Sequence, residues 1–149
     1  LNLPMHIFNN TWYENSISVE RGPITYALQI EEEVKKVTND KDPMEYGNTY
    51  YEVRPATPWN YGLFKAPDLY TVAQNKAVSD FPWNAASAPV MIKTKGKRIP
   101  SWGLYNDMTG YLPYSVTYQL ETEKEEEDII LIPYGCTQLH ISQFPVLRR

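Results

Sequence analysis

The 149-residue sequence is poor in the residues that build disulfides and metal centres, with one cysteine, Cys136, and two histidines. A single thiol excludes a disulfide within the chain, which is compatible with the cytosol and with a bacterial periplasm. On an extended strand Cys136 and His140 lie about 13 Å apart, too far for two ligands of one zinc ion. We therefore expect no metal site and no cofactor, and we expect Cys136 to be a buried structural thiol.

The sequence also lacks an excess of basic charge and a long apolar run. Its formal net charge is −4, and the densest group of cations lies on one expected strand: Lys93, Lys95, Lys97 and Arg98. Alternation places the three lysines on one solvated face, as on many edge strands, and we favour this interpretation over a functional patch. A phosphate-binding surface needs more clustered cations, and a membrane span needs about 18 apolar residues. We expect neither a nucleic-acid partner nor a membrane partner.

Aromatic residues are present in excess, with 12 Tyr, 4 Trp and 4 Phe. Such side chains suit half-buried sheet surfaces, and they also stack on sugar rings. Trp59, Trp83 and Trp102 lie near Pro, Gly or Asn, where loops carry side chains to the surface, and they are candidate platforms for carbohydrate. Covering an irregular loop onto a sheet is the commoner use of these residues. A contact with another domain or with a second copy is the third interpretation.

Short stretches with the two-residue alternation of half-buried strands recur along the chain. Together with many turns and little helix, they predict an all-β fold: a jelly-roll-like β-sandwich of about seven to nine antiparallel strands with long loops. We expect residues 1–149 to form a single domain. The expected strands are Leu3–Phe8, Ile17–Val19, Ile24–Ile30, Tyr50–Arg54, Pro89–Thr94, Ile129–Ile132 and Leu139–Ile141.

Four further segments give specific expectations. Glu31–Asp42 is charged and polar, which favours a surface loop or a short helix, and a second short helix is expected near Leu69–Gln74. Glu121–Asp128 contains six acids and one lysine, so mutual repulsion favours an exposed loop. Ile129–Ile132 is apolar on both faces, which predicts a central strand covered from two sides.

Arg21-Gly22-Pro23 interrupts the second and third expected strands. Because Gly22 precedes a proline, we expect extended backbone there, and Pro23 fixes the entry to the next strand. The turn itself does not require an arginine. We therefore predict that Arg21 binds a carboxylate or backbone carbonyls, or that it faces a neighbouring domain.

The acids do not nominate a catalytic pair. A glycosidase needs two carboxylates roughly 5 to 10 Å apart across a cleft. Most of the 18 acids fall in two solvated runs, Glu31–Glu33 and Glu121–Asp128. A reactive thiolate at Cys136 would need a neighbouring base or a helix N-terminus, and neither is evident. We expect no catalytic residue in this chain.

Several blocks, taken in order, resemble the β-L-arabinofuranosidase-like glycoside hydrolases, family 127 and its relatives. The clearest is Val19–Leu28, which is similar to the signature V-x-R-G-P-hydrophobic-x-Y of that family and includes Arg21, Gly22, Pro23 and Tyr26. The resemblance covers nearly the whole chain in the right order. The remaining blocks are Trp59–Leu63, Ala88–Val90, Arg98–Trp102 and Ile130–Thr137.

The resemblance implies a position within a larger enzyme. Members of the family begin with a helical barrel that carries the catalytic cysteine, zinc and glutamates, and β-sandwich domains follow. This chain would be a C-terminal, non-catalytic domain that supports the barrel of a bacterial, periplasmic or extracellular enzyme. Cys136 falls in the closing block and does not take the nucleophile's role. Since the sequence begins with Leu1, we expect a piece of a longer protein, and plant-derived carbohydrate is the expected ligand of the alternative, a carbohydrate-binding module.

Overall fold

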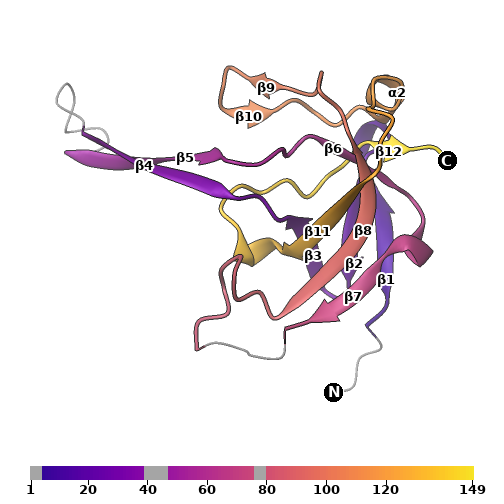
Figure 1. Ribbon diagram of the computed structural model, residues 1–149, viewed down its shortest axis with the longest axis horizontal. Coiled ribbons are helices and arrows are strands. Elements are labelled where there is room, and N and C mark those ends of the chain that lie inside the picture. Colours follow the sequence, from indigo (N-terminus) through magenta and orange to yellow (C-terminus); the bar gives the residue numbers. More distant parts are fainter. Residues whose placement is uncertain (1–4, 39–46, 76–79) are drawn as a thin grey trace.

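The computed structural model describes residues 5–38, 47–75 and 80–149, and strands dominate it (Figure 1). The expected all-β class with little helix is confirmed. The main sheet has the order β1-β2-β3-β11-β8-β6-β12, and β7 pairs with β8 beyond the end of β6. Its strands are β1 (Ile7–Thr11), β2 (Ile17–Arg21), β3 (Ile24–Leu28), β6 (Tyr61–Phe64), β7 (Thr71–Gln74), β8 (Val90–Arg98), β11 (Glu127–Pro133) and β12 (Val146–Leu147).

Two ribbons lie outside this sheet. One pairs β4 (Glu32–Thr38) with β5 (Thr49–Pro55), and the other pairs β9 (Leu104–Tyr105) with β10 (Thr109–Gly110). The helical segments are short: η1 (Tyr13–Asn15), η2 (Pro67–Leu69), α2 (Ser115–Tyr118) and η3 (Tyr134–Cys136). None of the described helices is long and apolar enough to span a membrane.

The main core fills the inner face of the curled sheet. Alternate residues of each strand point into it, as with Val19 on β2, Leu131 on β11 and Ile92 on β8, which are fully buried. β11 lies in the middle of the sheet and is covered on both faces, which confirms the expectation for Ile129–Ile132. Ile129 and Leu131 face the main core, whereas Ile132 packs with Cys136 and Ala88 on the other face.

The C-terminal segment closes the curled sheet. Phe144 exchanges backbone hydrogen bonds with Ile17 of β2, at 2.9 and 2.8 Å. One residue later, the carbonyl of Pro145 accepts from the Leu63 amide of β6 at 2.9 Å, and β12 then runs parallel to β6. The segment therefore links strands from opposite sides of the sheet. This parallel pair departs from the wholly antiparallel pattern that was expected.

The charged segment Glu31–Asp42 was expected to be a loop or a short helix, and for its described part this is wrong. β4 occupies Glu32–Thr38 and pairs along its length with β5. Its sequence shows no strand alternation because much of the ribbon is exposed on both faces, so pairing with β5 rather than burial decides the conformation. Residues 39–42 lie outside the described residues.

The short helix expected near Leu69–Gln74 is wrong as well. Only Pro67–Leu69 makes a helical turn, and Thr71–Gln74 forms β7. β8 is longer than β6, so its remaining backbone groups are available to a second partner strand, and β7 pairs there. Tertiary pairing has overridden the weak local pattern.

Three smaller expectations also change. Lys93 and Lys95 share one exposed face of β8, as expected, but β8 is an inner strand and not an edge, and Lys95 pairs with Asp128 at 2.6 Å. Leu139–Ile141 is not a strand, and the last described strand is β12. The acidic residues before β11 form an exposed loop, as expected.

Candidate functional site

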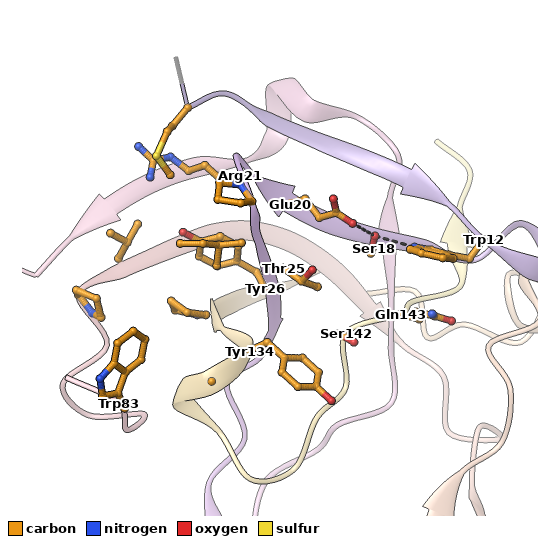
Figure 2. A pocket seen from close by; sticks show the side chains of 17 residues that line it. Trp12, Ser18, Glu20, Arg21, Thr25, Tyr26, Trp83, Tyr134, Ser142 and Gln143 are labelled. Carbon is orange, nitrogen blue, oxygen red and sulfur yellow. Dashed lines mark hydrogen bonds between the residues drawn. The ribbon is translucent and has the colours of Figure 1, made fainter. Parts of the chain in front are cut away.

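A surface groove of about 800 Å³ lies beside the Arg21-Gly22-Pro23 corner (Figure 2). It collects residues from β2, β3, the segment before β8 and the C-terminal segment, which are far apart in the sequence. The lining residues are Met5, Trp12, Ser18, Glu20, Arg21, Pro23, Ile24, Thr25, Tyr26, Trp83, Pro89, Val90, Pro133, Tyr134, Gly135, Ser142 and Gln143.

The corner forms the tight hairpin between β2 and β3. Arg21 pairs with Ile24, so Gly22 and Pro23 are the two loop residues. Gly22 has φ +59°, and the expectation of extended backbone at this position is wrong. Proline holds a negative φ, so the signs match a type II′ turn, which fits the twist of a two-residue hairpin. Gly22 is therefore required by the turn and not by its position before proline.

Beside this turn, two buried polar atoms come from residues that line the groove. Tyr26 is fully buried, and burial raises the pKa of its phenol above the ordinary value, while the neighbouring Arg21 guanidinium opposes part of that rise. Within the described part of the chain, neither the Tyr26 hydroxyl nor Arg21 Nε has a hydrogen-bond partner. Of the roles predicted for Arg21, a bond to a carboxylate or carbonyl is not seen among these residues. The role in facing a neighbouring domain stays a prediction.

Three partly exposed aromatic side chains give the groove its stacking faces. Trp83 is 60% exposed, Trp12 49% and Tyr134 43%. Figure 2 shows Trp12 beside Ser18 and Glu20, and Trp83 on the opposite side of the view with Tyr134 between them. Such faces can stack on a sugar ring while remaining in contact with water.

Hydrogen bonds fix Trp12 at one end of the groove. Trp12 Nε1 donates to Ser18 Oγ at 2.8 Å, and Ser18 Oγ donates to Glu20 Oε1 at 2.9 Å. Tyr134 is held differently, because its ring stacks on His140 with centroids 4.0 Å apart. The aromatic faces are therefore positioned by their neighbours before any ligand arrives.

The structure separates the tryptophans that the sequence grouped. Trp83 is exposed in the groove, whereas Trp102 is 2% exposed, so the expectation of a surface position for Trp102 is wrong. Trp102 packs edge-on against the half-buried Trp59 with centroids 5.2 Å apart, and its Nε1 donates to the Tyr111 carbonyl at 2.8 Å. Trp59 and Trp102 thus cover a loop, which is the commoner role considered above.

The groove also contains two aromatic residues that the sequence analysis did not single out, Trp12 and Tyr134. The same criterion could have found them. Trp12 follows Asn9 and Asn10, and Tyr134 lies between Pro133 and Gly135. What no local criterion supplies is their joint presence with Trp83 in one groove, because that depends on how three distant segments meet.

Cys136 lies under the loop that carries Trp83. It is 3% exposed, its Sγ lies 3.5 Å from the Pro82 carbonyl, and burial raises the pKa of the thiol. The prediction of a buried structural thiol is confirmed. Over the described ranges, no cluster of three or more His, Cys, Asp and Glu residues is arranged to hold a metal ion.

The groove offers the chemistry of recognition. It combines aromatic faces with the hydroxyls of Ser18, Thr25 and Ser142 and with one carboxylate, Glu20, among the described lining residues. Fold and groove together define an all-β domain with an aromatic surface groove. Comparison of the chain with family models, with curated proteins and with solved structures found no match. The family resemblance therefore rests on the ordered sequence blocks.

Proposed function

We propose that this chain is a non-catalytic, C-terminal accessory domain of a bacterial, periplasmic or extracellular β-L-arabinofuranosidase-like glycoside hydrolase. Its task is to support the helical barrel that carries the active site. The observation that carries the proposal is where the family-like blocks lie: they meet one another inside the domain. Residues used in this way preserve an architecture, as an accessory domain requires.

The blocks Trp59–Leu63 and Arg98–Trp102 meet through a buried amide. Asn60 Nδ2 donates to the carbonyls of Ile99 and Trp102, at 2.7 and 3.2 Å. A buried side chain that satisfies two loop carbonyls is costly to replace, because each carbonyl would lose its partner. This contact explains why an asparagine stands in the block.

The blocks Ala88–Val90 and Ile130–Thr137 meet in the second, smaller core. Ala88 is 1% exposed and packs with Ile132 and Cys136. Val19–Leu28 supplies the β2–β3 hairpin, whose two-residue turn needs Gly22. Each block thus has a packing or backbone reason, which supports a scaffolding role over a catalytic one.

The proposal is tested with the parent enzyme and with this chain alone. We expect the chain to hydrolyse no aryl β-L-arabinofuranoside, and we expect a parent that lacks these residues to lose both thermal stability and activity. Release of the aryl group and the midpoint of thermal unfolding are the measurements. Hydrolysis by the chain at a rate comparable with the parent would contradict the proposal, as would a truncated parent of unchanged stability and activity.

A second function, carbohydrate binding, is favoured by one specific observation. Trp12, Trp83 and Tyr134 present partly exposed rings in one groove that also carries hydroxyl groups and a carboxylate. Sugar recognition commonly uses such stacking faces together with hydrogen bonds. The candidate ligand is an arabinose-containing plant oligosaccharide.

Trp83→Ala is expected to weaken binding of such an oligosaccharide by about tenfold, because a stacked ring loses its platform. Isothermal titration calorimetry measures the effect. Phe81→Ala is the matched control, since Phe81 is 65% exposed in the same loop but does not line the groove. Equal affinity in all three proteins, or no binding of any arabinose-containing glycan, would reject this function.

A further inference from the structure

The β4–β5 ribbon extends away from the main sheet (Figure 1). Its base is held firmly: Glu32 Oε1 accepts from Thr137 Oγ1 and from the amides of Gln138 and Leu139, at 3.2, 2.8 and 3.1 Å. Arg54 of β5 pairs with Asp107 at 3.1 Å. A two-stranded ribbon is marginally stable in water unless further strands or a packed face support it. The secured base therefore presents a ribbon that would gain stability from a partner.

The two faces of the ribbon differ in character. On one face, Val34 stands opposite Val53, and Lys36 opposite Tyr51, while the charged pairs Glu33–Arg54 and Lys35–Glu52 lie on the other. Val34 is 54% exposed and Tyr51 62% exposed. The ribbon thus carries apolar side chains on a face that the described residues leave largely open.

One edge of the ribbon is also open. β4 pairs with β5 on one side only, and in the described part of the chain no strand pairs with its other edge. The outward backbone groups of β4 are therefore a template for another strand. Glu33, Lys35 and Lys36 are exposed, and none of them forms a salt bridge within the described residues.

The charges along this edge match their own reversal. β4 reads Glu32-Glu33-Val34-Lys35-Lys36. If a two-fold axis passes through Val34, an antiparallel copy places the partner's Lys35 opposite Glu33 and the partner's Lys36 opposite Glu32. Since both copies contribute, four opposite-charge pairs form, and pairs of this kind stabilise adjacent strands.

The neighbouring registers are disfavoured. An antiparallel ladder requires facing residues to point their backbone groups the same way, so the axis can move only in steps of one whole residue. An axis at Glu33 sets two glutamates opposite each other, and an axis at Lys35 sets two lysines opposite each other. Like charges directly opposite destabilise a strand pair. The charge pattern therefore selects the Val34 register.

We propose that a second copy of this chain pairs with it through the open edge of β4, antiparallel and centred on Val34. The two ribbons then form one four-stranded sheet, and Val34, Tyr51 and Val53 of both copies lie on the same face. The contact is isologous, with the same strand on both sides, so it closes as a dimer. This pairing is independent of the aromatic groove and of the proposed role in a glycoside hydrolase.

Charge reversal tests the pairing in the 149-residue chain. The substitution K35E sets two carboxylates opposite each other in both of the inner pairs, and E33K sets two ammonium groups opposite each other there. We expect each variant to dimerise at least about tenfold more weakly than the wild type. An equimolar mixture of the two variants forms only opposite-charge inner pairs between unlike chains, so we expect a heterodimer. Light scattering coupled to size exclusion measures the mass of each species.

Two further proteins separate lost pairing from a damaged ribbon. E33K/K35E carries both local changes in one chain but restores the pairs between copies, so it is expected to dimerise. K93E makes the same charge change on the exposed face of β8 and is expected to behave as the wild type. A wild type that stays monomeric up to its solubility limit overturns the proposal. So does a mixture, or a double variant, that stays monomeric.

Discussion

Phe144→Ala is expected to lower the free energy of unfolding by about 3–5 kcal/mol, because it empties a fully buried site where the chain closes the sheet. Phe144 is 0% exposed and belongs to the main core, and its backbone pairs with Ile17. The surrounding strands are held by their ladders and can collapse only partly into the cavity. Urea denaturation monitored by tryptophan fluorescence measures the change.

Phe81→Ala is the control for this substitution. It removes the same side chain from a site that is 65% exposed, so we expect a change within about 0.5 kcal/mol. A loss below about 1 kcal/mol for Phe144→Ala would mean that this ring does not complete the core. In that case the closure of the sheet by the C-terminal segment would depend on backbone pairing alone.

Gly96→Ala is expected to destabilise the domain by about 1–3 kcal/mol through overpacking. Gly96 lies where β8 is flanked by β6 on one side and by β11 on the other. A Cβ there would lie 2.8 Å from the Gly62 carbonyl oxygen and 2.9 Å from Ile129 Cγ1. Because the closest atom belongs to the backbone, relief requires β6 itself to shift.

Gly103→Ala is the matched control, because a Cβ at Gly103 meets no atom within 4 Å. We expect this variant to unfold at nearly the same urea concentration as the wild type. Equal stability of the Gly96 and Gly103 variants would show that β6 and β8 separate easily at this point. The strand pairing would then be looser than the register Leu63–Gly96 implies.

Much of the main sheet could be predicted from local pattern. Ile24–Leu28 alternates cleanly and forms β3, and the apolar run Ile129–Ile132 lies within β11 with both faces covered. In these segments burial leaves its period in the sequence. β4 leaves none, because most of its residues stay exposed and its partner β5 lies beyond an intervening segment.

The candidate site was predictable only in part. Trp83 was found because an aromatic residue beside Pro and Asn reaches the surface, yet the same criterion also selected Trp102, which is buried. The difference between these two tryptophans is set by what packs above them. Trp102 lies between Trp59 and Tyr118, whereas Trp83 faces the open groove.

The Arg21-Gly22-Pro23 corner shows how local and tertiary information divide. The sequence indicates a break between two strands, but the hairpin register places Gly22 at φ +59° and so determines its role.

By itself, the sequence determined that the chain is all-β, that Cys136 has no disulfide partner within it, and where most strands of the main sheet lie. These properties follow from composition and from alternation over a few residues. Only the tertiary structure decided the closure of the sheet by Phe144, the assembly of the groove and the open edge of β4. Each of these depends on contacts between residues distant in the sequence, and such contacts leave no local period to read.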